Sequence, residues 1–297
     1  MAQDVSIPFT AELSESARDI LAGGRDPAVP RDSATVMLLR PAPSAAALPA
    51  ATQAAPGPGA SGMEVYMLRR QSSMAFAPGA QVFPGGGVDV RDADEEVAWA
   101  GPDAQRWGEF FEAPPDLARA LVCAAVRETF EESGVLLAGG SADSVVADTT
   151  GEDWERDRNA LLDRSLSLAE LLARRRLVLR SDLLRPWSRW ITPVIEPRRY
   201  DTRFFAAQLP AGQRTRDVGG EAAATAWIEP SAALEAARRG AIRMLPPTAV
   251  TLAELAACGD LESVLSAPRK ALARIPEVLV REGAAWLTVP GVSEYPL

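Results

Sequence analysis

The sequence predicts an α/β sandwich with a helical carboxyl-terminal appendage. Short apolar, partly β-branched runs predict strands, the first two at residues 34–40 and 63–68. A helix is predicted from 116 to 133, where apolar residues recur every four positions from Val122 to Phe130 and supply a buried face. Strands, one central helix, more strands and then helices are an order typical of layered α/β folds.

The other elements are predicted from local patterns along the chain. Residues 11–22 are expected to form a short amphipathic helix that ends at two glycines. The stretch 41–62 is almost entirely Ala, Pro, Gly and Ser, which cannot bury enough apolar area to order itself, so a flexible loop is expected. The later predictions are a helix at 154–177, strands at 187–195, 200–209 and 224–228, and helices at 230–239, 247–257 and 260–274.

Composition excludes several classes of protein. Acidic residues outnumber basic ones 40 to 31, and the resulting net charge of −9 argues against a nucleic-acid partner. The absence of histidine excludes a Ser-His-Asp or Cys-His catalytic unit and a histidine-ligated zinc. Lys270 is the only lysine and no Gly-x-x-x-x-Gly-Lys precedes it, which excludes a Walker-type phosphate loop. Carboxylates must therefore carry any proton or metal chemistry.

Cysteine content and apolar runs bear on the compartment. Cys123 and Cys258 are too few for a thiolate metal site and suit a reducing compartment. No apolar run approaches the roughly 18 residues of a membrane span, and the amino terminus lacks a basic head followed by an apolar core. We therefore predict a soluble, cytoplasmic protein with no membrane partner.

Three carboxylates crowd one turn of the predicted helix. Glu128 lies one turn from both Glu131 and Glu132, a spacing that indicates either a solvated helix face or a cation site. Upstream, the turn at Gly85-Gly86-Gly87 allows the backbone to approach a ligand closely. Hard cations such as Mg²⁺ take carboxylate and backbone carbonyl oxygens, which favours the cation site.

These two stretches resemble the defining motif of the Nudix hydrolase family. The second half of the Nudix box is matched from Arg127 through Gly134 to Val135, with Thr129 where an aliphatic residue is usual. In the first half, counting six residues on from Gly86 reaches Asp92 rather than a glutamate. Counting eight residues back from Arg127 reaches Arg119, so the box is split by an insertion of about 27 residues.

Further motifs are similar to those of the Nudix branch that cleaves coenzyme A (CoA) and acyl-CoA diphosphates. They are Gly-Ala-Gln-Val-Phe-Pro-Gly-Gly from Gly79, Arg-Tyr-Asp-Thr-Arg-Phe-Phe from Arg199, and Met-Leu-Pro-Pro-Thr from Met244. The resemblance implies a Nudix-type α/β/α sandwich with a mixed sheet, helical insertions and a helical carboxyl-terminal extension. The expected parts are an arm (1–30), a Nudix domain (31–235) with an insertion at 90–115, and a mainly helical extension (236–297).

The resemblance also implies which residues bind metal and act on water. Arg127 is expected to orient the cluster by pairing with Glu131, and Glu128 is expected to be the base, with Glu221 as the alternative. The expected ligands of Mg²⁺ or Mn²⁺ are Glu128, Glu131, Glu132, the Gly85 carbonyl and Glu221.

Arginines near these motifs are candidates for binding substrate phosphates, because guanidinium forks match phosphate oxygens. Each is alternatively an ordinary surface arginine, and Asp201 is expected either to orient one of them or to begin a strand turn. The candidate substrate-binding residues are Arg69, Arg70, Phe83, Gly86, Arg198, Arg199 and Arg203.

The implied activity is metal-dependent hydrolysis of a nucleoside diphosphate linked to another moiety, with CoA or acyl-CoA as the leading substrate. ADP-ribose, NADH or a nucleotide sugar is the alternative, because Ala75 stands where the CoA-recognition signature places an arginine. A third possibility is a Nudix fold that binds a nucleotide without cleaving it. The helices after Pro247 either cap the substrate pocket or pair two subunits as a homodimer.

Overall fold

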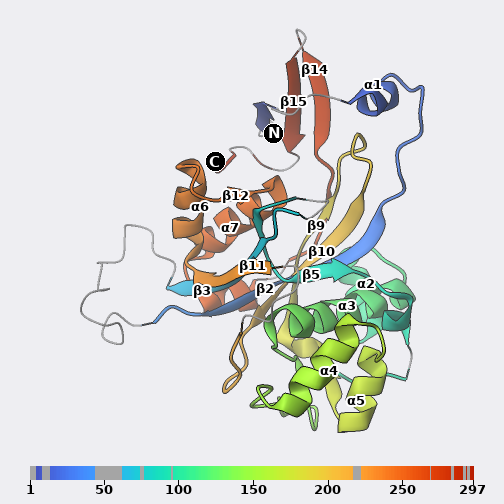
Figure 1. The fold of residues 1–297 in the computed structure, drawn as a ribbon, viewed down its shortest axis with the longest axis vertical. Helices are drawn as coiled ribbons and strands as arrows, with labels where there is room; N and C mark the ends of the chain where they lie inside the picture. Colours follow the sequence, from blue (N-terminus) through green and yellow to red (C-terminus); the bar gives the residue numbers. More distant parts are fainter. Residues whose placement is uncertain are drawn as a thin grey trace.

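The computed structural model describes residues 5–8, 14–43, 62–73, 77–94, 96–216, 222–267, 269–281, 284–289, 292 and 295–297. Figure 1 shows a large twisted sheet with helices packed on both of its faces, and a smaller sheet where the two ends of the chain approach each other.

The main sheet is mixed. Its strands run in the spatial order β12-β4-β3-β2-β10-β9-β13, with β5 also paired to β2 and β11 to β3. β10 lies parallel to β2, whereas it is antiparallel to β9. The strands are β2 (Arg31–Pro41), β3 (Met63–Arg70), β4 (Ala80–Val82), β5 (Gly85–Gly87), β9 (Leu184–Ile191), β10 (Tyr200–Gln208), β11 (Ala222–Ile228), β12 (Arg243–Met244) and β13 (Ala273–Arg274).

Alternating side chains of the strands face two separate cores, which confirms the predicted α/β/α layering. Val36 and Phe205 pack on one face, and their chain neighbours Met37 and Phe204 pack on the other. The first face is covered by α2 (Ala104–Phe111), α3 (Pro115–Ser133), α4 (Glu152–Leu162) and α5 (Leu168–Arg175). The second is covered by α6 (Pro230–Arg238), α7 (Pro246–Cys258) and α8 (Leu261–Ser266).

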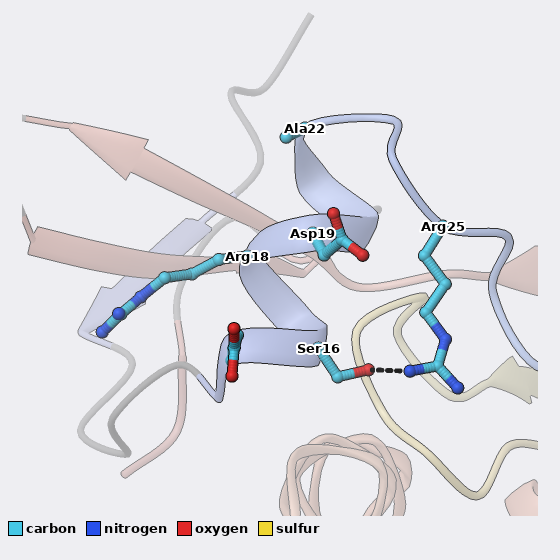
Figure 2. Close-up of a pocket in the computed structure, with 6 residues that line it drawn as sticks. Ser16, Arg18, Asp19, Ala22 and Arg25 are labelled. Carbon is cyan, nitrogen blue, oxygen red and sulfur yellow. Dashed lines mark hydrogen bonds between the residues drawn. The ribbon is translucent and has the colours of Figure 1, made fainter.

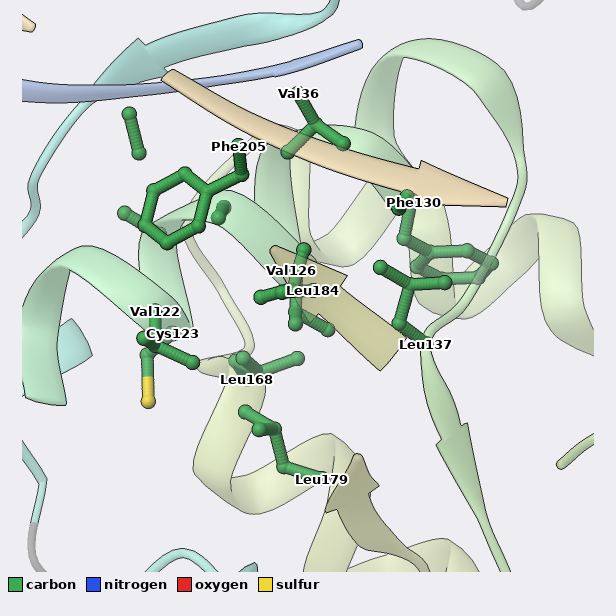
Figure 3. Packing of buried hydrophobic residues seen from close by; sticks show 14 of the residues in the cluster. Val36, Val122, Cys123, Val126, Phe130, Leu137, Leu168, Leu179, Leu184 and Phe205 are labelled. Atoms are coloured by element: carbon green, nitrogen blue, oxygen red, sulfur yellow. The ribbon is translucent and has the colours of Figure 1, made fainter. Parts of the chain in front are cut away.

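The predicted central helix is α3. Pro115 occupies its first turn, and Gly134 ends it in the left-handed conformation with φ of 75°. Figure 3 shows Val122, Val126 and Phe130 directed into the core between α3 and the sheet. The helix is therefore anchored along its length, which holds its carboxyl-terminal turns in a defined place.

Two helix predictions are wrong. The pattern over 154–177 forms two helices, because Arg164 is left-handed (φ 64°) and Ser167 starts α5 with a capping box to Glu170. The pattern over 260–274 gives the helix α8 and, at its end, the two-residue strand β13.

The carboxyl-terminal extension contains strands as well as helices. Besides β13, it contains β14 (Glu277–Arg281) and β15 (Ala284–Val289). β15 pairs antiparallel with β14 on one edge and with β1 (Val5–Pro8) on the other. The β-branched and alternating residues of β14 and β15 suit strands. The hydrogen bonds come partly from β1, which lies near the other end of the described chain. The predicted arm also contains α1 (Glu15–Leu21), within the helix expected at 11–22.

The insertion within the Nudix box is structured. It holds the short 3₁₀ helix η3 (Val90–Ala93), β6 (Trp99–Ala100) and α2. β6 joins β8 (Val178–Arg180) and β7 (Ala138–Gly139) in a third sheet, and η4 (Ser181–Leu183) follows β8. Trp107 of α2 is fully buried against α3, which fixes the insertion to the core. Most of the expected flexible loop, residues 44–61, lies outside the described residues. None of the described helices has the length and apolar character needed to cross a bilayer.

Candidate active site

The glycine strand β5 lies directly against the carboxyl-terminal half of α3. It pairs antiparallel with β2, from Gly85 opposite Thr35 to Gly87 opposite Ser33. A side chain at Gly86 would come 2.5 Å from the carboxyl carbon of Glu128, and one at Gly85 would collide with the β2 backbone. The backbone contact requires glycine at position 85, whereas a side chain at position 86 would displace the Glu128 carboxylate, which lies over the strand.

A hydrogen bond joins the two halves of the split box. The Gly85 backbone amide donates to Oε2 of Glu132 over 2.8 Å. The insertion between these residues does not separate them, because α2 and η3 fold away beside α3. The expectation that the glycine turn lies beside the carboxylates is thus confirmed for Gly85, Gly86, Glu128 and Glu132.

Arg127 donates hydrogen bonds to two of the carboxylates and to the glycine strand. Its Nη1 donates to Glu128 Oε1 (2.7 Å) and to Glu131 Oε1 (3.2 Å), as expected for Glu131. Its Nη2 donates to the Gly87 carbonyl over 2.9 Å, which ties the helix to the glycine strand. The side chain is 10% exposed, so these bonds form in a largely dry environment.

Asp92 is a site residue that the sequence reasoning did not assign. Its carboxylate accepts two parallel bonds from Arg127, each of 2.9 Å, and its side chain is only 1% exposed. It is held in place by a capping box in which the Asp89 amide donates to Asp92 Oδ2. The sequence signal for this carboxylate was its position six residues after Gly86, where the Nudix box has a glutamate. Arg119, reached by counting back along the helix, instead stacks over Trp99 at 5.1 Å.

Burial and crowding of negative charge shift the acidities of the cluster. The pKa of Glu128 is raised to about 7, chiefly by burial and also by the neighbouring charge of Glu131, against the lowering effect of Arg127. Burial also raises the pKa of Glu131. Burial alone would lower the pKa of Arg127, but its bonds to Asp92 and the charges around it raise it. The cluster thus has an excess of carboxylate over cationic charge.

The donor chemistry of the cluster fits a hard divalent cation, but the side chains are turned toward protein donors. Among the described residues, no three His, Cys, Asp or Glu side chains converge closely enough to hold a metal ion. Glu132 accepts from Gly85, whereas Glu128 and Glu131 accept from Arg127. Carboxylates beside a glycine carbonyl are nevertheless the oxygen ligands that Mg²⁺ and Mn²⁺ take.

Two of the predicted substrate arginines are engaged by the protein itself. Arg199 donates to the carbonyls of Thr192 and Ala28, and Arg203, 2% exposed, donates to Asp32 and to the Asp201 carbonyl. Asp201 accepts two bonds from Arg189, and it pairs with the candidate Arg203 over 3.2 Å. Phosphate binding by Arg199 and Arg203 stays a prediction.

The other predicted substrate residues differ in exposure. Arg69, which is exposed, and Arg70, which is half-buried, form the end of β3. Arg198 is exposed in the connection between β9 and β10. Phe83 is buried edge-on to Phe204 at 6.5 Å, which makes it part of the core. Glu221, the alternative base, lies outside the described residues.

One surface hollow lies away from the cluster. About 600 Å³ in volume, it lies on α1, and Figure 2 shows its polar residues with a single hydrogen bond from Arg25 to Ser16 (3.2 Å). In Figure 1, α1 lies at the opposite end of the molecule from α3. The carboxylate cluster therefore remains the candidate site.

A mixed sheet between helical layers, with an Arg-Glu-x-x-Glu-Glu helix end against a glycine strand, defines a Nudix domain. The profile of the NUDT19 Nudix domain matches residues 98–255, more than half of the chain, and the protein belongs to this family. The Nudix resemblance of the sequence is thereby confirmed.

Relatives and a solved structure agree with this assignment. The chain is 31% identical over 266 residues to the Gallus gallus acyl-coenzyme A diphosphatase NUDT19, covering 76% of the chain and 68% of the relative. The Xenopus laevis protein of the same name is 27% identical over 229 residues, and the chain spans 59% of its length against 65% of its own. A Nudix hydrolase structure from Alicyclobacillus acidocaldarius superimposes with a TM-score of 0.65 at 26% identity, covering 82% of this chain and 99% of that one.

Proposed function

We propose that the protein is a divalent-metal-dependent hydrolase that cleaves the diphosphate of CoA or acyl-CoA. Its products would be 3′,5′-ADP and 4′-phosphopantetheine or the acylated form of the latter. The observation that carries the proposal is the bond between Gly85 and Glu132, which reassembles a Nudix box that is split in the sequence. The name acyl-coenzyme A diphosphatase borne by both relatives supports the choice of substrate.

In this proposal Glu128, Glu131, Glu132 and the Gly85 carbonyl hold Mg²⁺ or Mn²⁺. Such an ion neutralises phosphate oxygens and makes water more acidic. To bind it, the carboxylates must exchange their bonds to Arg127 and Gly85 for the ion. Rotation of the side-chain ends suffices for this, since α3 and β5 are both held by the core.

The chain itself supplies the proton acceptor and its orientation. Glu128, whose carboxylate lies over the glycine strand, is the proposed proton acceptor. Arg127, bound on its far side by Asp92, keeps the carboxylates aimed across the glycine strand. Gly86 leaves the space in which a substrate oxygen can approach Glu128.

Product analysis tests the proposal. The purified protein is incubated with CoA and Mg²⁺ or Mn²⁺, and 3′,5′-ADP and 4′-phosphopantetheine are quantified by chromatography. Glu132→Gln should abolish turnover while circular dichroism stays native, because it removes a ligand but keeps an acceptor for the Gly85 amide. Glu152→Gln, on the exposed first turn of α4, is the matched control and should retain activity. Turnover by Glu132→Gln at the native rate would reject the site.

A second substrate class is favoured by one residue. Ala75 replaces the arginine of the CoA-recognition signature, so ADP-ribose, NADH and a nucleotide sugar belong in the same screen. Cleavage of one of these without cleavage of CoA would replace the proposed substrate. Tight nucleotide binding with no product at any metal concentration would instead favour a non-catalytic binding module.

We also propose a reducing, cytoplasmic compartment, which the free thiols of Cys123 and Cys258 support.

A further inference from the structure

The last turn of α3 carries Glu131 and Glu132 and ends at Gly134. The last intrahelical bond runs from the Gly134 amide to the Phe130 carbonyl over 2.9 Å, and the next amide, of Val135, donates to a side chain instead. The final carbonyl groups of an α-helix have no amide partner within the helix, and a turn whose carbonyls are unbound frays. The carbonyls that follow Phe130 therefore need donors from outside the helix.

Three distant parts of the chain supply such donors. They are Arg158 Nη1 to the Glu131 carbonyl (2.9 Å), the Arg216 amide to the Ser133 carbonyl (3.1 Å) and the Thr149 hydroxyl to the Gly134 carbonyl (2.6 Å). Of these three donors, Arg158 alone is a charged side chain, and a positive charge suits the negative end of the helix dipole. It also binds the backbone of a residue that carries a candidate metal ligand.

The helix α4 brings Arg158 to this position. Figure 1 shows α4 beside α3, and Trp154, one turn before Arg158 on α4, packs edge-on against Phe130 with ring centres 6.1 Å apart. The Arg175 guanidinium lies 3.5 Å from the Trp154 ring centre, which holds the indole in place. The side chain of Arg158 is only 3% exposed. Its bond to α3 is thus shielded from competing water.

Glu155 orients the Arg158 guanidinium. Its carboxylate accepts from Nε over 3.0 Å and from Nη2, a two-point contact that fixes the plane of the group. Asn159 Oδ1 also accepts from Nη2 over 3.1 Å. Nη1 is consequently aimed at the Glu131 carbonyl. The same Glu155 carboxylate accepts from Arg216 Nη2 over 3.2 Å, so one residue links two of the three outside donors.

The bond from Arg158 differs in kind from the bonds on the carboxylate side of the turn. There the Gly85 amide donates to the Glu132 side chain, and Arg127 donates to the Glu131 side chain. In the proposed metal complex these carboxylates exchange such bonds for the ion. The Arg158 bond goes to the backbone and does not have to be exchanged. It therefore holds the turn in place both with and without metal.

We propose that Arg158 is a positioning residue for the metal-binding carboxylates, acting through the backbone of Glu131. The inference rests on the proposed function, since it takes Glu131 and Glu132 as metal ligands. Residues that orient metal ligands typically change metal affinity about 10- to 100-fold when they are removed. Arg158 acts on the backbone of the ligand rather than on its carboxylate, so we expect a change of about 10-fold.

Arg158→Met tests the assignment, because it removes the guanidinium and keeps a long side chain that fills the space. In calorimetry with Mn²⁺ alone, the Kd should rise about 10-fold. Arg158→Lys can still donate one bond to the carbonyl but cannot make the two-point contact with Glu155, so its Kd should rise less. Arg156→Met, at an exposed position of the same helix, is the matched control and should leave the Kd as in the wild type.

The kinetics of CoA hydrolysis should separate metal binding from substrate binding. At a Mn²⁺ concentration below the Kd, Arg158→Met should lower kcat and leave the KM for CoA unchanged. Excess Mn²⁺ should restore kcat, because the carboxylates themselves are intact. A kcat that stays low at saturating Mn²⁺, together with an unchanged Kd for Mn²⁺, would contradict a role in positioning the ligands.

Amide hydrogen exchange of the metal-free protein distinguishes positioning from general stability. Exchange over residues 130–134 should be faster in Arg158→Met, while exchange over residues 117–125 of the same helix should not change. Glu155→Gln, at a side chain that is 41% exposed, should give a smaller change in the same direction. Faster exchange along the whole of α3 in both variants would assign Arg158 to general stability and would overturn the inference.

Two further results would also overturn the inference. One is wild-type exchange over residues 130–134 in Arg158→Met, and the other is an unchanged Kd for Mn²⁺ in that variant or a wild-type protein that binds no Mn²⁺. Failure of the proposed function is distinguishable, because it appears as CoA left uncleaved by a wild-type protein that does bind Mn²⁺.

Discussion

Replacing Asp92 by asparagine removes the charge that faces Arg127 on the side away from the catalytic carboxylates. The wild-type pair makes two bonds of 2.9 Å, with side chains that are 10% and 1% exposed. Breaking a buried ion pair by removing one partner costs about 3–5 kcal/mol. Arg127 retains Glu128, Glu131 and the Gly87 carbonyl, and asparagine still offers one acceptor, so we expect a smaller loss, about 2–3 kcal/mol.

Urea unfolding followed by tryptophan fluorescence measures this loss, and CoA hydrolysis measures its effect on the site. The midpoint should fall, and kcat should fall with it, because Arg127 is then free to shift toward the remaining carboxylates. Glu109→Gln makes the same chemical change at the exposed pair with Arg106, where the side chains are 54% and 58% exposed. That control should lose no more than about 1 kcal/mol. An Asp92→Asn protein as stable as this control would refute the role assigned to Asp92.

Three further changes test the geometry and charge of the site. Gly86→Ala places a methyl group against the Glu128 carboxyl group, which can rotate away. The fold should therefore persist, while kcat should fall about 10²-fold. The control Gly87→Ala, at a position with open space around it, should retain the wild-type kcat. The pKa of Glu128 in the metal-free folded protein is raised to about 7, so the folded protein binds this proton more tightly than the unfolded chain does. The free energy of unfolding should therefore fall as pH rises from about 5 to 8. Glu128→Gln should flatten that decline in urea midpoints, and an unaltered slope would contradict the assignment. Burial raises the pKa of Cys123 to about 12, so a thiol reagent should titrate only the half-buried Cys258 until the protein is unfolded; two thiols reacting at the same rate in the native protein would contradict this.

Features that depend on neighbouring residues were predictable from the sequence. Helix α3 begins at a proline and ends at a glycine, and its apolar repeat faces the sheet, because caps and helix periodicity are local properties. The adjacency of Glu128, Glu131 and Glu132 follows from the same periodicity. The absence of histidine directed attention to these carboxylates, and the pairing of the glycine strand with α3 was expected from the family motif.

Only the tertiary structure decided which distant residues meet. Asp92 reaches Arg127 across the insertion because η3 packs against α3, and no local pattern specifies that contact. Strand β15 pairs with β1, near the other end of the described chain, and no local pattern within the expected mainly helical extension indicated that pairing. Arg203 resembled a surface phosphate ligand in the sequence, yet the register of β10 beside β2 buries it with Asp32. Long-range pairing leaves no local pattern in the sequence. The sequence by itself therefore determined the helix that carries the candidate site, whereas the tertiary structure determined which distant residues contact it.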